Sequence, residues 1–247
     1  MFAAVWSANR AAAEQPESRM THHISRKATW LALTVAAPAL LLAQAGAAEA
    51  ASTVASWQMD DHGRSMKDSS DNHVNGRLFG GVQTQVTGYS GEGFGFTAPE
   101  SYVTVSDKSV LDPGTSTWTV SMRVKLDAAP SAAQGTADLL RKGVATTSGG
   151  DYKVEILSTG ALHCLYRGSS GKVEVIASTN LADGEWHSIS CTRTSSSVTA
   201  TVDGASTSRA GRSGTISNDS AVYLGAKLAG GEDQFVGTLD EVRITKG

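Results

Sequence analysis

The stretch TWTVSMRVKL, residues 117–126, decides the fold class of this 247-residue chain. Its apolar residues stand at every second position: Trp118, Val120, Met122, Val124 and Leu126. The residues between them are threonine, serine, arginine and lysine. Side chains of a β-strand point alternately to the two faces of a sheet, so this pattern predicts a strand with one buried and one solvated face.

The same alternation returns along most of the sequence after residue 50. It covers residues 102–106, 152–157, 161–167, 172–178, 198–204 and 239–245. Turn signals such as ADG, VDG and LAGG separate these segments, and no sustained helical period of apolar residues interrupts them. We therefore expect an all-β domain of antiparallel strands, either a sandwich or a closed barrel.

Residues 20–50 have the three-part pattern of a secretory signal peptide. Arg26 and Lys27 supply the basic region, an apolar region follows, and small residues precede the expected cleavage after Ala50, with Ala45 as the alternative. The protein is therefore expected to be secreted. The other interpretation of this segment is a short N-terminal helix of the domain.

The expected signal peptide separates two further segments of the chain. Residues 1–19 are expected to be an N-terminal extension ahead of the working start, Met20, and residues 51–247 the folded domain. That domain has 17 Lys and Arg against 21 Asp and Glu, a net charge of 17 − 21 = −4. With no basic run, nucleic acid is excluded as a partner, and no membrane span is expected in the mature form.

Several segments, taken in order, resemble one known family. They are SWQMDD (56–61), DSSDNHVNGRL (68–78), GYSGEGFGF (88–96), STWTVSMRVKL (116–126), NLADGEWHSISCTR (180–193) and FVGTLDEVRI (235–244). This order resembles the laminin-G-like (LamG), concanavalin A-like jelly-roll domains of secreted bacterial proteins, over about residues 56–245. The resemblance implies an antiparallel two-sheet jelly-roll sandwich. Such folds include lectins, adhesion modules and glycosidases, so it indicates the fold more than the activity.

The pair Trp186–His187, after the turn Asp183–Gly184, raises the question of a catalytic histidine. In the family that it resembles, this D-G-x-W-H element is structural, with Trp186 packing at a sheet edge. By alternation His187 shares a face with Ile189, so we expect it at the margin of the core with local hydrogen bonds. No serine or cysteine nucleophile motif accompanies it, although a catalytic role is the alternative.

The chain has two cysteines, Cys164 and Cys191. In an exported protein a pair of cysteines is expected to form a disulfide. The family resemblance implies that their two strands lie close together, which makes the bond geometrically feasible. Two buried reduced thiols are the alternative.

The start of the domain concentrates oxygen ligands. Six of them lie within sixteen residues: Asp60, Asp61, Asp68, Asp71, Asn72 and Asn75. Calcium takes six to eight oxygens from carboxylates, amides and backbone carbonyls. The family resemblance implies a structural calcium held by Asp60, Asp68 and Asp240, with Asn72 and Asn75 as further oxygen donors. A solvated loop, in which these residues form turns, is the alternative.

A sugar site usually needs an aromatic platform and a few fixed polar groups. Tyr166 and Arg167, beside the expected hairpin tip RGSSGK, are the candidate ligand-binding residues. Trp118 and Tyr152 share faces with apolar residues and are expected in the core.

Catalytic motifs are not found in the sequence. The E-x-D-x-x-E arrangement of jelly-roll glucanases is absent, Glu155 and Glu174 each stand alone on their strands, and no zinc motif occurs. We expect a non-enzymatic recognition module that binds a polysaccharide or cell-surface glycan, with a structural calcium. The alternatives are a protein-binding adhesion domain and, less favoured, a glycoside hydrolase.

Overall fold

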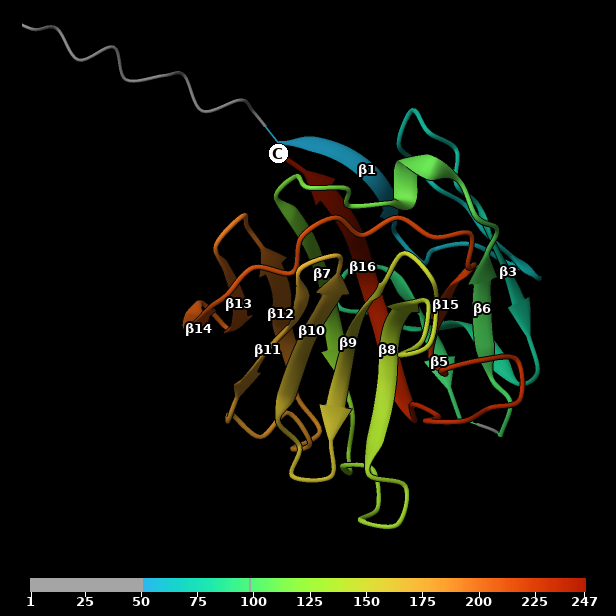
Figure 1. Ribbon diagram of the computed structural model, residues 1–247. Helices are drawn as coiled ribbons and strands as arrows, with labels where there is room; N and C mark the ends of the chain where they lie inside the picture. Colours follow the sequence, from blue (N-terminus) through green and yellow to red (C-terminus); the bar gives the residue numbers. More distant parts are fainter. Residues whose placement is uncertain (1–50, 98) are drawn as a thin grey trace, which may run out of the picture. The chain divides into compact units, whose positions relative to one another are not determined.

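The computed structural model describes residues 51–97 and 99–247. The predicted N-terminal extension and signal peptide, residues 1–50, lie outside this range. The described residues form two antiparallel β-sheets, with strands β8, β9, β10 and β11 of one sheet in front of β7, β12 and β16 of the other in Figure 1. The predicted all-β jelly-roll sandwich is confirmed.

The first sheet, sheet A, has the order β14-β13-β12-β7-β16-β5-β4, and β1 also pairs with β16. Its strands are β1 (Ser52–Trp57), β4 (Val82–Thr87), β5 (Glu92–Phe96), β7 (Trp118–Lys125), β12 (Trp186–Arg193), β13 (Ser197–Val202), β14 (Ala205–Ala210) and β16 (Gly237–Lys246). The last strand is central because β7 lies on one side of it, while β5 and β1 share the other side.

The second sheet, sheet B, has the order β11-β10-β9-β8-β15-β6-β3-β2. Its strands are β2 (Ser65–Met66), β3 (Gly76–Phe79), β6 (Tyr102–Val105), β8 (Thr136–Lys142), β9 (Asp151–Leu157), β10 (Leu162–Gly168), β11 (Gly171–Ala177) and β15 (Val222–Leu224). A single 3₁₀ turn, η1 (Ser109–Leu111), is the one helical element of the described residues. None of the described helical structure is long and apolar enough to cross a membrane.

The strands predicted from alternation agree with those of the structure to within about two residues at each end. The segment 117–126 becomes β7, whose residues alternate between buried and partly exposed along its whole length. The apolar face of β7 turns toward sheet B because only there can it leave water.

Three large aromatic side chains fill the space between the sheets. Trp118 of sheet A contacts Tyr152 of sheet B edge-on, with ring centroids 5.9 Å apart, and Tyr152 stacks on Tyr166 at 6.1 Å. The tyrosine hydroxyls donate to the backbone carbonyls of Leu111 and Cys191, at 3.1 and 2.8 Å. These bonds satisfy polar atoms that burial would otherwise leave without partners. Trp118 and Tyr152 therefore lie in the core, as predicted.

A fully buried lysine ties the loop around η1 to sheet B. The ammonium of Lys142 lies 2.8 Å from a carboxylate oxygen of Asp107 and 2.9 Å from one of Asp112. It also donates to the backbone carbonyl of Asn218. A buried charge is tolerated only when it is paired in this way.

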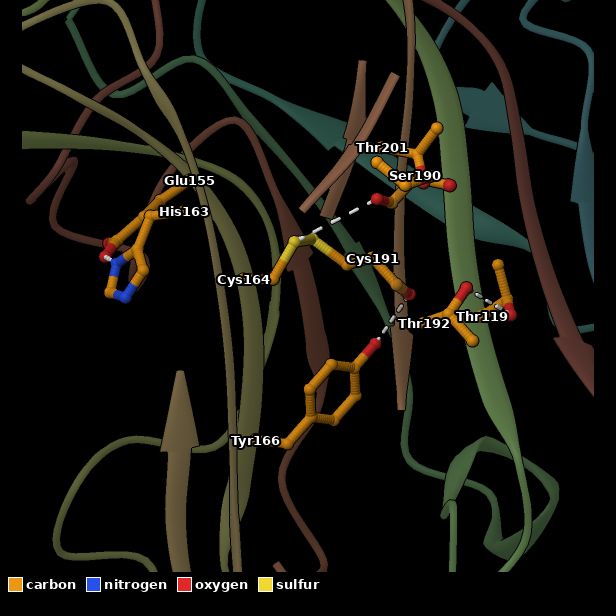
Figure 2. Close-up of a disulfide and its surroundings, with 10 residues drawn as sticks. Thr119, Glu155, His163, Cys164, Tyr166, Ser190, Cys191, Thr192 and Thr201 are labelled. Atoms are coloured by element: carbon orange, nitrogen blue, oxygen red, sulfur yellow. Dashed lines mark hydrogen bonds and ion pairs between the residues drawn. A yellow bond between two sulfur atoms is a disulfide. The ribbon is translucent and has the colours of Figure 1, made fainter. Parts of the chain in front are cut away.

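The predicted disulfide Cys164–Cys191 is formed, with the two Cα atoms 5.5 Å apart. Cys164 lies on β10 and Cys191 on β12, so the bond joins sheet B to sheet A. In Figure 2 the hydroxyl of Tyr166 points to the backbone of Cys191 beside this bond. The sheets are therefore linked covalently and by a hydrogen bond at neighbouring points.

His187, at the start of β12, has only 8% of its surface exposed, and its ring has two acidic partners. Its Nδ1 lies 2.7 Å from Asp203 and its Nε2 lies 3.0 Å from Asp183. Burial by itself lowers the pKa of His187, but the hydrogen bonds to the two carboxylates outweigh it and raise the pKa above the usual 6.5. The local hydrogen bonding predicted for His187 is therefore present, and it fastens the 183–187 turn to the β13–β14 hairpin.

The disulfide is expected to contribute about 3–4 kcal/mol to the free energy of unfolding, since it closes a loop between residues 27 apart. The double variant Cys164→Ala/Cys191→Ala should unfold at a correspondingly lower urea concentration. Reductant should destabilise the wild type and leave the variant unaffected. An unchanged urea midpoint in the variant would contradict this role.

The protonated form of His187 is favoured in the folded state, so its contribution to stability is full below pH 6.5 and is lost as pH rises through the raised pKa. The variant His187→Gln should therefore melt well below the wild type at pH 5.5 and closer to it at pH 8.5. His73→Gln, at an exposed histidine, is the matched control and should not change the pH profile. A gap between His187→Gln and wild type that is equal at both pH values would refute the role of the protonated ring.

Candidate functional site

The outer face of sheet A, turned away from sheet B, is polar. The alternation that buries the apolar residues of β7 and β12 sends the others outward. They are Thr119, Ser121, Arg123 and Lys125 on β7, and Trp186, Ser188, Ser190 and Thr192 on β12. Hydroxyl and cationic groups dominate this set, and Trp186 is its one aromatic member.

A polar groove of about 330 Å³ runs over this face, here called the sheet A groove. It is lined by Ser56, Gln58, Ser121, Met122, Arg123, Ser188, Glu241 and Arg243. These residues come from β1, β7, β12, β16 and the residue after β1, so strands distant in sequence build it together. Its hydrogen-bonding groups lie on regular strands, which hold them at fixed spacings.

An aromatic and charged cluster lies at one end of the groove. Tyr89, which is 50% exposed, meets Trp186 edge-on with ring centroids 6.2 Å apart. The guanidinium of Arg123 lies over the Tyr89 ring, 4.1 Å from its centroid, and its Nε lies 3.1 Å from a carboxylate oxygen of Glu241. The cation–π contact and the ion pair together fix the direction of Arg123.

A β-bulge in β16 holds the loop that carries Tyr89. The pairing of β16 with β7 shifts between Asp240 and Arg243, and Glu241 has a φ of 48°. On a regular strand, the neighbours Asp240 and Glu241 would point to opposite faces. At the bulge, Asp240 instead accepts a hydrogen bond from the backbone N–H of Ser90 at 3.0 Å, while Glu241 reaches Arg123.

The loop fits closely against this support. A Cβ atom at Gly88 would lie 2.2 Å from the backbone oxygen of Glu92 and 2.7 Å from a carboxylate oxygen of Asp240, so only glycine fits there. Asp60 accepts a hydrogen bond from the backbone N–H of Glu92 at 2.8 Å. Two carboxylates from opposite ends of the domain thus anchor one loop.

The four predicted calcium ligands do not form one site. Asp68 is buried and its two oxygens accept four hydrogen bonds, from the backbone N–H groups of Ser56, Ser70 and Val74 and from the Ser70 hydroxyl. The Asn72 amide donates to the backbone carbonyls of Thr53 and Val54. Both side chains hydrogen-bond to backbone groups of β1, so they fasten the opening loop to this strand.

Asp60 and Asp240 form a separate pair at the 88–92 loop. Asp240 is fully buried, and burial raises its pKa against the opposing effect of backbone hydrogen bonds from Ser90 and Glu241. No lysine, arginine or histidine of the described residues forms an ion pair with it, and no group of three or more metal-ligating side chains is found in the same part of the chain. Of the predicted ligands, these two carboxylates are the ones that bind the backbone of the 88–92 loop.

The predicted ligand pair Tyr166–Arg167 is divided between two faces of β10. Tyr166 is only 1% exposed and lies in the core, so its ring has no surface to offer a ligand, which disagrees with the prediction. Arg167 points outward, pairs with Asp151 at 3.3 Å and borders a hollow of about 410 Å³. Alternation along a strand separates neighbouring side chains, so the two cannot share a site.

A buried charge network crosses the outer face of sheet B. His163 lies 2.6 Å from Glu155 and 3.4 Å from Glu174, so the ring contacts glutamates of two different strands, β9 and β11. Arg141 pairs with Asp138 at 2.5 Å. Asp138 and Glu155 face each other across β8 and β9.

The two facing carboxyls differ strongly in acidity. Burial raises the pKa of Asp138 to about 7, with Arg141 opposing it. For Glu155, burial is outweighed by the hydrogen bond from His163 and the charge of Lys153, which lower the pKa to about 2. Glycosidases use carboxyl pairs split in this way, but here both carboxyls are buried and engaged by basic side chains. The network ties the strands of sheet B together and offers neither carboxyl to a substrate.

The sequence interpretation missed Tyr89 and gave Trp186 only a packing role. The alternation that placed His187 and Ile189 inward also placed Trp186 outward, so a signal for Trp186 was present. Tyr89 lies in the glycine-rich turn GYSGEG, where an aromatic residue has no apolar neighbours. Its meeting with Trp186 depends on the bulge at Asp240, for which the sequence has no pattern.

Solved structures similar to this one share its fold at low sequence identity. Domain 4 of AbnA, an extracellular arabinanase from Geobacillus stearothermophilus solved with arabinotriose, is 17% identical with a TM-score of 0.61, over 80% of this chain and 93% of that one. The binding domain of Paraclostridial Mosquitocidal Protein 1 is 19% identical with a TM-score of 0.60, over 78% and 48%. The receptor binding domain of botulinum neurotoxin D is 11% identical with the same TM-score, over 78% and 48%.

This chain therefore spans about half the length of the toxin binding domains. No curated protein matches its sequence. One of these domains was solved with arabinotriose, one is a toxin's binding domain and one a receptor binding domain, and at these identities the likeness shows the fold alone. A family model matches residues 96–247, more than half of the chain. The two-sheet fold and this match together show that the chain belongs to the concanavalin A-like lectin/glucanases superfamily, as a domain of the laminin-G type.

Proposed function

We propose that this protein is a secreted carbohydrate-binding module whose saccharide ligand lies in the sheet A groove. The cluster of Tyr89, Trp186 and Arg123 at the end of the groove is the observation that carries the proposal. Sugars combine an apolar ring face with many hydroxyl groups. A ring face packs on an exposed aromatic side chain, and the hydroxyls need fixed donors and acceptors beside it.

The groove supplies both kinds of contact. Tyr89 presents half of its surface to solvent, while Arg123 and Glu241 are held against it and against each other. The serines of β1, β7 and β12 add hydroxyl groups along the floor. These groups are already ordered in the free protein, so little conformational entropy is lost on binding.

The larger hollow nearby, of about 460 Å³, is less suitable. It lies between the 127–131 loop and the start of β16 and is lined largely by alanine, glycine, proline and threonine. No aromatic ring of the described residues lines it. It offers no stacking surface for a sugar.

Secretion rests on the signal-peptide pattern of residues 20–50, and the arabinanase domain solved with arabinotriose supports the carbohydrate class. The alternative is a protein ligand, and the toxin domain named a receptor binding domain is compatible with it. A glycan array with the purified domain decides between the two. Specific retention supports the lectin-like function, while binding to no glycan would overturn it.

Removing the aromatic platform should weaken binding of any saccharide that the array identifies. Tyr89→Ala and Arg123→Ala should each reduce the affinity about ten-fold, equal to about 1.4 kcal/mol, as measured by titration calorimetry. Ile176→Ala, at an exposed apolar residue of sheet B, is the matched control and should bind like the wild type. Circular dichroism checks that all three variants fold. Wild-type affinity in both groove variants would place the ligand elsewhere.

The proposal retains a structural calcium, limited to Asp60, Asp240 and backbone oxygens of the 88–92 loop. A cation there would neutralise the buried Asp240 and hold the loop that carries Tyr89. Calcium added to EDTA-treated protein should release heat and raise the melting temperature. Asp240→Asn should abolish both effects, whereas Asp71→Asn, at an exposed acid of the opening loop, should preserve them. Absence of heat and of a melting shift in the wild type would remove the calcium from the proposal.

A further inference from the structure

The outer face of sheet A carries cations that have no acidic partner. Arg123 is neutralised by Glu241 at 3.1 Å. Lys125 and Arg243 form no ion pair or side-chain hydrogen bond with any described residue, although the domain as a whole has a net charge of −4. Two unpaired cations on one face of an acidic protein are suited to an anionic ligand.

Arg243 occupies a position suited to binding an anion. It lies on β16 between Ser56 of β1 and Ser121 of β7, which are its partners across the two strands. It lines the sheet A groove and also borders a second hollow of about 420 Å³, where Asp71 is the one acid and forms no ion pair with it. An arginine flanked by hydroxyl groups can bind a carboxylate or sulfate through two parallel hydrogen bonds.

Lys125 lies farther along the same face. In the register of β7, Arg243 pairs with Ser121, so Lys125 is four residues farther, or about 14 Å at about 3.4 Å per residue. Trp186 is the partner of Lys125 across β12, and Arg123 with its Tyr89 contact lies between the two cations. The order along the strand is thus cation, aromatic cluster, cation.

We propose that the sheet A groove selects an acidic polysaccharide over a neutral one. The chain lies along β7, one sugar ring packs against Tyr89 and Trp186, and acidic groups pair with Arg243 and Lys125. The inference rests on the proposed carbohydrate-binding function and adds the ligand's charge to it. Uronate carboxylates and sulfate esters have the same charge and hydrogen-bond acceptors, so the experiment includes both.

The test compares saccharides that differ only in charge. Polygalacturonate is paired with its fully methyl-esterified form, and dextran sulfate is paired with dextran. Titration calorimetry at low salt should show at least ten-fold tighter binding of one acidic member than of its neutral partner. That preference should shrink as salt is added, because ions screen exposed pairs. Which acidic member binds identifies the carboxylate or the sulfate as the recognised group.

Variants at the cations test the residues. Arg243→Gln should remove most of the preference for the acidic saccharide, Arg243→Lys should retain part of it, and Lys125→Gln should reduce it. Arg64→Gln, at an exposed arginine next to sheet B, is the matched control and should leave it unchanged. An undiminished preference in Arg243→Gln overturns the inference.

The two proposals fail in different ways. Equal binding of acidic and neutral saccharides, abolished by Tyr89→Ala, overturns the charge selection and leaves the carbohydrate-binding function standing. Binding of no saccharide on the array or in these titrations overturns both.

Discussion

The burial of two apolar sheet faces against each other is the constraint on which the rest of this structure depends. Once Trp118 and its alternating neighbours turn toward sheet B, the residues between them must face solvent. A shift of one residue in the pairing of β7 would exchange the two sets. The polar groove over sheet A is therefore a direct consequence of the core. The disulfide and the Tyr166 hydroxyl fasten the same two layers near β10 and β12 (Figure 2), which holds the groove on a rigid support.

The candidate site arises where this regular pattern is broken. The bulge at Asp240 and Glu241 sends two neighbouring carboxyls to one region of the outer face. One carboxyl anchors the 88–92 loop, and the other directs Arg123 toward Tyr89. A regular strand would have separated these groups and left Tyr89 without support. Irregular backbone within a rigid sheet is where this family of folds can vary its binding chemistry without changing its core.

The two sheets use charge in different ways. On sheet B the charged groups are buried and paired, as His163 with Glu155 and Arg141 with Asp138 show, so they contribute to cohesion between strands. On sheet A, Arg243 and Lys125 have no ion-pair partner among the described residues, and Arg243 lines a groove that also carries serine hydroxyl groups. Buried pairs are poor ligand sites because a ligand would have to displace their partners. Unpaired cations at the surface have no such cost, and for this reason the functional proposals concern sheet A.

The sequence by itself determined the all-β class, the position of most strands and the inward direction of Trp118 and Tyr152, because alternation is a local property that the core then enforces. The disulfide was expected from the two cysteines of an exported protein and from the family resemblance. The role of His187 followed from the same alternation together with the family resemblance. Only the tertiary structure decided the site. Tyr89 and Trp186 are 97 residues apart, and their contact depends on a bulge in a third strand. The predicted ligands Asp68 and Asn72 instead hydrogen-bond to backbone groups of β1, and the Tyr166 hydroxyl donates to the backbone of Cys191 on the opposite sheet. Buried polar groups need partners, and no local sequence pattern identifies these partners.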